Sequence, residues 1–555
     1  MGPGAGVGGL PARRRAVRSL AVVVALAVAG CTGGGSDGSG GSGGAGGSHG
    51  GGVAPGGRSG GTLAIALLDP GPLDPARVDG LEDEVVLGNL FDGLTTLDPT
   101  GAVRPAAAVS WTSDPSLRRW EFRLRPDAHW SDGSPVRSSD FTFAWQRLAD
   151  PKAKPSPSPA RALLSGVAGY RSFVAGRSRT IAGLTTPDPA TLVVRLDRPL
   201  ADLPALVAAL PLSPLPSTLV RPDPAAYLTR PVGNGPFRLV GPARSGRLTL
   251  ERNPAFWGSP ALLDRVSVHT VPDEQTAWLE LQNGQVGFAP VPLDQLAAAR
   301  TVYGPSPDGR TNPGLLQGPT LTTWQLTFNL RSKLGGDGRW RQAVSLAIDR
   351  DQVAAALAGT PATSLVPPAT PGWGTGGTGS GAGGTASGAG GAASPCSACA
   401  HDPAKARSLF ARSKTGRAPV TLAVPPGAEA GRVAELVADD LAAVGVDLTA
   451  TPSPTGETPV TLVRRVAPYP RPDPFLTGPF TISPQAQRQL DQARTTPDDP
   501  TRTALYHQAE ATVLADLPAA PLLTEHHAAV LSPGPQGVNL TPWDTLDLAT
   551  VSLPA

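Results

Sequence analysis

The sequence has 555 residues but little net charge, few aromatic residues and three cysteines. Its 47 Lys and Arg residues nearly balance 45 Asp and Glu residues, which leaves a formal charge of +2. No basic stripe with interleaved aromatic residues follows the N-terminus, so we do not expect a protein that binds nucleic acid. No apolar run after residue 31 is long enough to span a bilayer. A chain of this length has room for about two to four structural units.

The sequence also lacks the motifs of the common enzyme classes. Outside the Gly/Ser-rich residues 32–61 it contains no G-x-S-x-G, and it has no Walker A pattern and no G-x-G-x-x-G that opens a helix after a strand. The pair His526-His527 lacks the spacing of a zinc-binding helix, so we interpret both as ordinary strand or loop histidines. We therefore expect a protein that is not an enzyme and that has neither a metal site nor a cofactor.

The N-terminus, by contrast, has the organisation of an export signal. Arg13–Arg15 and Arg18 precede the apolar stretch Leu20–Ala29, which is too short to span a bilayer. The stretch runs into Val28-Ala29-Gly30-Cys31, a lipobox whose small residues give a signal peptidase access to the bond before the cysteine. We predict that residues 1–31 are a lipoprotein signal, exported by the general or the twin-arginine route, and that Cys31 is lipidated and becomes the mature N-terminus.

Residues 32–61 consist almost wholly of Gly, Ser and Ala. A segment of this composition cannot bury enough apolar surface to fold, so it predicts a flexible tether. Its mean reach is about 30 Å, from roughly 5–6 Å × √n for a Gly-rich chain. Together with the lipobox, the tether predicts a folded body anchored to the outer face of the cell membrane.

The remaining cysteines, Cys396 and Cys399, follow the Gly-rich loop Gly372–Ala393 with C-x-x-C spacing. In an exported protein this spacing favours a local disulfide. A redox-active pair is the alternative, although a thioredoxin-like motif would follow a strand and open a helix. Two thiols without nearby histidine or acidic ligands do not predict a metal site.

The body of the chain alternates between strand and helix periodicity. Leu63–Leu67 and Leu192–Leu196 are expected strands, and Trp120, Phe122 and Leu124 alternate with charged residues as a half-buried strand does. Helical spacing is expected at Trp340, Val344, Ala347 and Ile348, and again over 433–444, where Gly445 is placed to end the helix. With strands at 420–424 and 446–448 on either side, the second helix completes a βαβ unit, so we predict a mixed α/β fold with a parallel region.

The stretch His129–Arg147, HWSDGSPVRSSDFTFAWQR, is unusually rich in aromatic residues and carboxylates. Asp132–Pro135 is typical of a turn, and Ser138 or Ser139 can cap a helix that begins near Asp140. Phe141, Ala144 and Trp145 recur at helical spacing. We therefore expect these rings to face a core.

Ten segments, in order along the chain, resemble one family, the family 5 solute-binding proteins of ABC importers for oligopeptides, dipeptides and related ligands. The stretch at 129–147 matches its W-S-D-G-[TS]-P-V signature almost position for position. The others are Leu73–Pro75, Asn89–Leu94, Asp98–Pro105, Val232–Phe237, Asn253–Trp257, Phe328-Asn329, Arg341–Arg350, Asp402-Pro403 with Lys405-Ala406, and Leu505–Glu510.

The resemblance implies an α/β, periplasmic-binding-protein-like clamp (type II, cluster C) with two lobes and an extra inserted domain. Lobe one would comprise residues 62–98, about 190–320 and about 520–555. The inserted domain would span about 99–189. Lobe two would span about 321–519 and include the Gly-rich loop 371–395. A ligand would be enclosed when the lobes close about their hinge.

By resemblance, peptide-binding relatives hold the ligand's α-ammonium with an Asp in a segment like W-C-A-D-Y, because a buried cation needs a carboxylate. The corresponding segment here is Arg465-Val466-Ala467-Pro468-Tyr469, so Pro468 replaces that Asp. Asp79 or Asp473 could take the role, although Asp473 is equally expected to cap a turn. The alternative is a ligand without a free ammonium. The predicted ligand-binding residues are Asp79, Gly80, Leu81, Trp324, Gln325, Arg465, Val466, Ala467 and Tyr469.

Two of these residues have a second interpretation. Trp324 could equally belong to the core, and Arg465 could meet a carboxylate or phosphate on the ligand.

The function that the resemblance implies is capture of a peptide or peptide-like ligand by a monomeric, lipid-anchored, extracytoplasmic protein. Its partners would be the permease and ATPase subunits of an ABC importer, with no nucleic acid. The alternatives are a sensor or scaffold that delivers nothing to a permease, a binder of a sugar or metal chelate, and an enzyme of unrecognised chemistry.

Overall fold

The computed structural model describes residues 57–78, 80–153, 156–243, 246–304, 314–374, 396–452 and 458–554. The predicted export signal, Cys31, residues 32–56 and Asp79 lie outside the described residues. The predicted boundary of the tether at residue 61 is too late, because Gly57–Arg58 form strand β1, which pairs antiparallel with β19 (Leu553–Pro554). None of the helices in the described ranges combines the length and the apolar character that a bilayer crossing needs.

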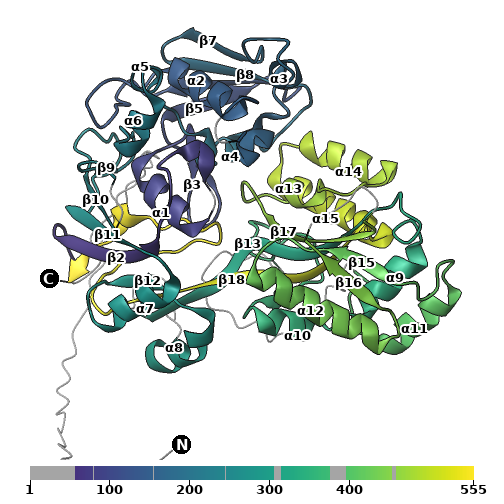
Figure 1. The fold of residues 1–555 in the computed structure, drawn as a ribbon. Helices are drawn as coiled ribbons and strands as arrows, with labels where there is room; N and C mark the ends of the chain where they lie inside the picture. Colours follow the sequence, from purple (N-terminus) through teal and green to yellow (C-terminus); the bar gives the residue numbers. More distant parts are fainter. Residues whose placement is uncertain are drawn as a thin grey trace, which may run out of the picture. The chain divides into compact units, whose positions relative to one another are not determined.

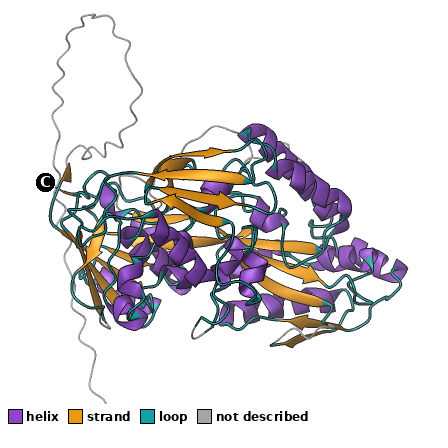
Figure 2. Cartoon of the chain, turned by 90° about the horizontal axis from the view of Figure 1, so that it is seen from above, coloured by secondary structure: helices purple, strands orange, loops and turns teal. Residues whose placement is uncertain are grey.

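An 11-stranded sheet runs through most of the body, with its strands in the order β16-β15-β17-β13-β18-β12-β2-β11-β10-β9 and β14 paired with β18. Figure 1 shows this sheet linking the two halves of the ribbon, and Figure 2 shows helices packed around it. The strands are β2 (Thr62–Leu68), β9 (Phe237–Leu239), β10 (Arg247–Arg252), β11 (Arg265–Val271), β12 (Phe288–Pro290), β13 (Gly314–Phe328), β14 (Thr360–Pro361), β15 (Val420–Ala423), β16 (Leu448–Thr451), β17 (Val460–Val466) and β18 (Ala519–Leu531).

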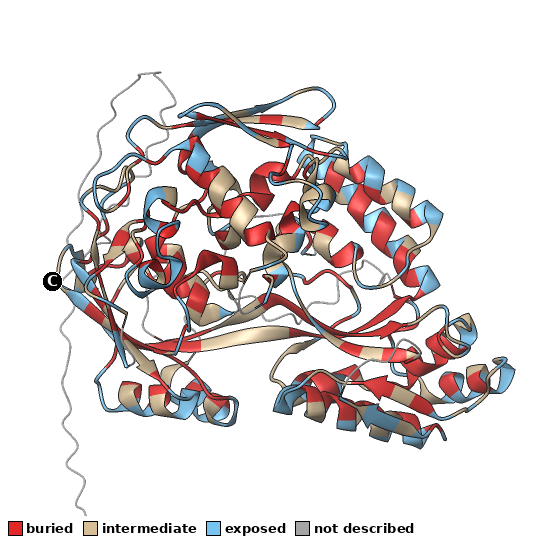
Figure 3. Cartoon of the chain, turned by 45° about the horizontal axis from the view of Figure 1, so that its top comes forward, coloured by how far each residue is buried: buried red, intermediate tan, exposed pale blue. Residues whose placement is uncertain are grey.

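Two long antiparallel strands, β13 and β18, are shared by two apolar cores. The first core contains Leu316 of β13 and Leu531 of β18, whereas the second contains Leu326 and Leu522 of the same two strands. Figure 3 shows buried residues along these strands and exposed residues on the outer faces of the helices. The chain therefore forms two packed bodies that are joined through this strand pair.

The first core combines lobe-one residues with a separate four-stranded antiparallel sheet. This sheet has the order β5-β6-β8-β7 (Ala108–Ser113, Arg119–Leu124, Thr191–Arg195, Leu184–Asp188). The predicted inserted domain, about 99–189, ends too early, because β8 pairs with both β6 and β7. Nor does the sheet have a core of its own, since Phe122 packs in the same cluster as Ile65.

The remaining elements around the first core are short helices and a two-stranded sheet of β3 (Thr95–Leu97) and β4 (Val103–Pro105). The helices are α1 (Leu81–Leu90), α2 (Ser138–Ala149), α3 (Tyr170–Val174), α4 (Leu203–Leu206), α5 (Ser217–Val220) and α6 (Pro224–Thr229). Two further helices, α7 (Glu274–Gln282) and α8 (Leu296–Tyr303), pack in a third, smaller apolar cluster with Leu315 of β13 and Val530 of β18. Turns of 3-10 helix occur at Pro75–Arg77, Pro159–Leu164, Leu210–Leu212, Leu293–Gln295 and Leu548–Thr550.

The second core contains the βαβ unit that the sequence predicts. β15 and β16 pair in parallel, and the intervening helix α12 (Ala428–Ala443) buries Val433, Val437 and Leu441. Gly445 follows with a φ of +83°, a conformation that favours glycine and ends the helix. The other helices here are α9 (Gly338–Ala347), α10 (Arg350–Ala356), α11 (Pro403–Arg412), α13 (Asp473–Leu476), α14 (Pro484–Arg494) and α15 (Asp499–Asp516).

Residues 129–147 fold as a turn followed by α2. Phe141, Ala144 and Trp145 are buried in the first core, as their spacing predicts. The helix starts two residues earlier than expected, at Ser138, whose hydroxyl donates to the Asp188 carbonyl instead of capping its own helix. The carboxylate of Asp140 instead accepts from the backbone N–H of Arg137.

The segment Gly233-Asn234-Gly235-Pro236 is explained by close backbone packing. A Cβ atom on Gly233 would lie 1.9 Å from the carbonyl oxygen of Leu90, so this position admits no side chain. Between the two glycines, the Asn234 amide exchanges two hydrogen bonds of 2.9 Å with the backbone of Asp92. The segment thus fixes the end of α1, the helix whose other end enters the cavity described next.

Candidate functional site

A cavity of about 1240 Å³ lies between segments that belong to the two cores. From the first core it is lined by the start of α1, by residues 159–171 and by residues 194–213. From the second it is lined by the end of β17 and the loop to α13, and between them by parts of β13 and β18. A cavity of this size can enclose a small ligand from several sides.

The segment that replaces the relatives' ammonium-binding motif forms part of this lining. Arg465, Val466, Ala467 and Tyr469 all border the cavity, as do Gly80 and Leu81 from α1. Val466 is 56% exposed, the highest exposure of the large apolar residues at this site. The structure thus brings together six of the predicted ligand-binding residues, and their contact with a ligand stays a prediction.

Trp324 and Gln325 are not in the lining, so the expectation that they face the ligand is wrong. Both lie in the middle of β13, where strands pair on either side, and Gln325 is fully buried. The indole N–H of Trp324 donates to the carboxylate of Glu525, which does line the cavity. Trp324 therefore positions a cavity residue from behind.

Asp473 is held by an arginine of its own chain. Its carboxylate accepts from Nε of Arg494 at 2.8 Å, and both side chains are largely buried. Asp473 opens α13 and borders the cavity, but its charge is already compensated. It is consequently a poor substitute for an ammonium-binding carboxylate.

Arg465 has no carboxylate partner within salt-bridge distance among the described residues. Its guanidinium donates to the Pro474 carbonyl, and its Cζ lies 5.9 Å from the centre of the Phe480 ring. Burial lowers the pKa of Arg465 to about 10, against the opposing charge of Asp473. At neutral pH Arg465 is therefore a charged guanidinium that can bind an anionic group of a ligand.

Sequence reasoning missed a group of carboxylates on the wall of the cavity. Glu525 among them forms a two-point ion pair with Arg464, at 2.7 and 2.8 Å. The others come from four separate elements or segments and are Glu82, Glu84, Glu274, Glu429 and Asp544. The signal was present in the run Leu81-Glu82-Asp83-Glu84, but acidic residues are common in the first turn of a helix and carry no functional implication there.

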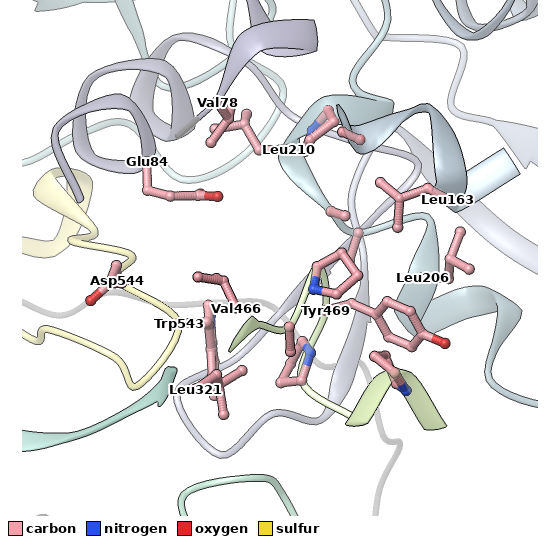
Figure 4. Close-up of a pocket in the computed structure, with 18 of the residues that line it drawn as sticks. Val78, Glu84, Leu163, Leu206, Leu210, Leu321, Val466, Tyr469, Trp543 and Asp544 are labelled. Carbon is pink, nitrogen blue, oxygen red and sulfur yellow. The ribbon is translucent and has the colours of Figure 1, made fainter. Parts of the chain in front are cut away.

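Leucine side chains line the cavity away from these carboxylates (Figure 4), on segments that also bring Arg171 and Arg198 to the lining. Figure 4 shows Leu163 and Leu206 near the Tyr469 ring, across the open space from Glu84 and Asp544. Leu210 and Val78 border the space between them. The cavity therefore has chemically different ends.

The two adjacent histidines lie in β18, as expected of strand residues, and both border the cavity. Nε2 of His526 lies 2.6 Å from the Thr360 hydroxyl, and burial, followed by the charges of His527 and Arg300, lowers its pKa to about 4. Nδ1 of His527 lies 3.5 Å from Asp544. Within the described ranges, no group of histidine, cysteine and acidic residues is arranged to hold a metal ion.

Cys396 and Cys399 are joined by a disulfide in the second core, next to α11. Both residues are almost fully buried, at 2% and 3% exposure. This placement, after the Gly-rich loop and away from the cavity lining, gives the pair a structural role.

Comparison with known proteins identifies relatives for most of the chain. Residues 102–487 match the family described as bacterial extracellular solute-binding proteins, family 5 Middle. The probable deoxycholate-binding periplasmic protein YgiS of Escherichia coli K12 is 30% identical over 313 residues, which cover 55% of this chain and 56% of the relative. The periplasmic murein peptide-binding protein MppA of the same strain is 30% identical over 314 residues, again 55% and 56%. The chain thus spans about half the length of the curated relatives it matches.

Solved structures show the same fold over a longer range. The murein tripeptide binding protein MppA of Escherichia coli superposes with a TM-score of 0.68 at 24% identity, covering 90% of this chain and 99% of that one. The OppA protein of Haemophilus influenzae, in complex with RPPGFSPFR, has a TM-score of 0.66 at 20% identity, with 89% and 99% coverage. These likenesses confirm the predicted two-lobed α/β fold.

Proposed function

Since the chain belongs to the bacterial extracellular solute-binding proteins of family 5, we propose that it captures a peptide or peptide-like ligand in its cavity and delivers it to the permease of an ABC importer. Members of this family bind solutes and are not enzymes, in agreement with the missing catalytic motifs. The observation that carries the proposal is the cavity of about 1240 Å³ between the two cores, with the segment Arg465–Tyr469 in its lining.

An open strand edge beside this cavity supports a peptide ligand. β17 pairs with β13 from Val460 to Val466, whereas β15 pairs with β17 only at Val460 and Thr461. In the part of the chain that the structure describes, the opposite edge of residues 462–466 therefore has no strand partner. An extended peptide can add itself to such an edge through main-chain hydrogen bonds, and pockets for its side chains then give specificity.

The names of two relatives point in the same direction, whereas YgiS of Escherichia coli is named for deoxycholate. MppA of Escherichia coli is named for murein peptide, and the relative from Salmonella typhimurium, 29% identical over 311 residues, is named a periplasmic oligopeptide-binding protein. The proposal extends to this chain the same extracytoplasmic location, with lipid on Cys31 as the anchor and the permease and ATPase of an importer as partners. Asp79 stays a predicted ligand contact, alongside Arg465 as a contact for an anionic group.

Native mass spectrometry of the full chain, purified without unfolding, tests the proposed ligand class. We expect a bound species with the mass and fragmentation of a short peptide or peptide derivative. Protein that has been unfolded in guanidinium and refolded is the control, because it must lose that species and regain it from a peptide extract. A bound sugar or metal chelate would contradict the proposal.

Incorporation of labelled palmitate by growing cells tests the anchor separately. The wild-type chain should carry the label and remain with the membrane fraction. The variant Cys31→Ala should lose both properties, whereas an unlabelled wild-type chain would exclude the lipoprotein assignment.

A further inference from the structure

The wall of the cavity holds four carboxylates from three parts of the chain. Glu82 and Glu84 lie in the first turn of α1, Glu274 opens α7, and Asp544 belongs to the segment after β18. Among the described residues, no Lys or Arg forms an ion pair with any of these four, and Asp544 has a histidine as its ion-pair neighbour. In Figure 4 the Glu84 side chain reaches into the open space.

These carboxylates act on one another. Burial, and then the charges of Asp544 and Asp83, raise the pKa of Glu84 to about 8. Burial is also the main cause that raises the pKa of Glu82, and the charge of Asp544 raises it further. The pKa of Glu274 is raised by burial and then by the charge of Glu82. Residues from three different parts of the chain therefore form one region of negative potential inside the cavity.

Of the basic residues that line the cavity, Arg464 and His526 are engaged or neutral, whereas Arg465 has no carboxylate partner among the described residues. Arg464 is bound through two atoms to Glu525. His526, with a pKa lowered to about 4, is neutral at physiological pH. A carboxylate taken out of water without a partner is costly, so it is stabilised either by a proton or by a cation that comes from outside the chain.

The other end of the cavity accepts a different group. Leu163, Leu206 and Leu210 are buried or nearly so, and with Tyr469 they present an apolar surface that gains from contact with an apolar ligand group. The two ends thus impose a direction on whatever is bound.

We propose that the cavity selects a peptide-like ligand that places a cationic amine or guanidinium group against Glu84, Glu82, Glu274 and Asp544, and an apolar side chain against Leu163, Leu206 and Leu210. This inference rests on the proposed function, and the enclosed cavity, not the acidic group alone, locates the site. The cationic group of a peptide is either its α-ammonium or a Lys or Arg side chain. Both have the same chemistry, and acetylation of the N-terminus separates them.

Binding of synthetic tetrapeptides to the refolded, ligand-free chain tests the inference by calorimetry. The probes are Ala-X-Ala-Phe with X as lysine, norleucine or glutamate, each with a free and with an acetylated N-terminus. We expect lysine to bind at least about tenfold more tightly than the isosteric norleucine, and glutamate to bind most weakly. If acetylation removes all cation-dependent binding, the cation is the α-ammonium; if the lysine preference survives acetylation, it is the side chain.

The variant Glu84→Gln keeps the shape of the side chain and removes its charge. It should reduce the preference for lysine over norleucine by about tenfold. Glu435→Gln is the matched control, because Glu435 is exposed on α12 and outside the cavity lining, and it should leave the preference unchanged. Circular dichroism and thermal unfolding verify that each variant is folded.

Proton release provides a second readout. A cation beside Glu84 stabilises its ionised form, so binding of the lysine peptide to the wild type at pH 7 should release a proton, which calorimetry in buffers of different ionisation enthalpy detects. Glu84→Gln should release less. Equal affinity for all three peptides whether or not their N-terminus is acetylated, or a preference for glutamate, would overturn the inference and leave the proposed function standing. Failure of every peptide to bind would overturn both.

Discussion

Burial raises the pKa of both the Asp202 and the Glu84 carboxyl, but only Asp202 has arginine partners from the described chain. The side chain of Asp202, 2% exposed, has Arg502 at 3.1 Å and Arg471 at 3.4 Å, and the Tyr506 hydroxyl donates to it at 3.4 Å. No partner of this kind lies at Glu84 in the described part of the chain. A carboxylate whose cation belongs to the same chain holds the fold together, whereas one without such a cation is free to meet a ligand.

The location of Asp202 fits its role. It precedes α4 in the first part of the body, whereas Arg471 follows β17 and Arg502 lies in α15. Nearby, the backbone N–H of Ala201 donates to the Arg494 carbonyl, and Arg471 also donates to the Gly101 carbonyl. These contacts join segments on either side of the cavity, so Asp202 links the two bodies at a point away from the acidic wall.

Asp202→Asn is the variant that should have the largest effect on stability. The substitution leaves Arg471 without its carboxylate and Arg502 with only the exposed Asp499, and removal of one partner of a buried ion pair costs about 3–5 kcal/mol. Urea unfolding followed by fluorescence measures the loss. Asp197→Asn, an exposed carboxylate five positions earlier, is the control and should change the free energy of unfolding by less than about 0.5 kcal/mol. A similar value for both variants would remove the distinction between Asp202 and a surface residue.

Glu84→Gln should raise the free energy of unfolding, whereas Asp202→Asn lowers it. Because the folded-state pKa of Glu84, about 8, lies above its ordinary value of 4.5, the folded chain holds a proton that the unfolded chain releases between these pH values. The free energy of unfolding of the wild type should therefore fall as pH rises from about 5 to about 8. Near pH 8, Glu84→Gln should be more stable than the wild type by about 1–2 kcal/mol, a figure reduced for the solvent that reaches the side chain.

The pH dependence includes contributions from the groups around Glu84. Those that face it or its immediate neighbours are Glu82, Asp83, Glu274, His527 and Asp544. Thermal unfolding of the wild type, Glu84→Gln and Glu435→Gln between pH 5 and 8 isolates the contribution of Glu84. Parallel curves for all three proteins would show that Glu84 is solvated like the exposed Glu435.

The contrast between the two carboxylates also explains what the sequence could predict. Local periodicity predicted the mixed α/β fold and the core positions of Phe141 and Trp145, because helix and strand spacing act over short distances along the chain. The family signatures added the two-lobed clamp. The segment Arg465–Tyr469 was placed at the cavity by the resemblance alone, since its composition carries no signal of its own.

The acidic wall could not be predicted because its members come from distant parts of the chain. The charge of Asp544 raises the pKa of Glu84, although the two residues are 460 positions apart in the sequence. No local pattern reports whether a carboxylate will meet an arginine, as Asp202 does, or remain without one. Trp324 was misplaced for a related reason: its strand was expected to face the cleft, but pairing with β17 and β18 buries it on both edges.

Arg464→Met sharpens the comparison by converting a paired cavity carboxylate into an unpaired one. Glu525 would keep its hydrogen bond from the Trp324 indole but lose both contacts to the guanidinium. Since the Arg464 side chain is 45% exposed, the loss of stability should not exceed about 1 kcal/mol. The acidic wall gains one more uncompensated charge, so affinity for the lysine tetrapeptide should rise several-fold.

Arg104→Met is the matched control for this last variant. It removes an ion pair of 2.7 Å to Asp98, and its side chain is 48% exposed, close to that of Arg464. Both variants should therefore show a similarly small change in the free energy of unfolding, but Arg104 lies outside the cavity lining and its loss should leave peptide binding unchanged. If Arg464→Met and Arg104→Met bind the lysine peptide equally well, the charge of the wall does not set the affinity, and unpaired carboxylates in this cavity must be explained without a cationic ligand.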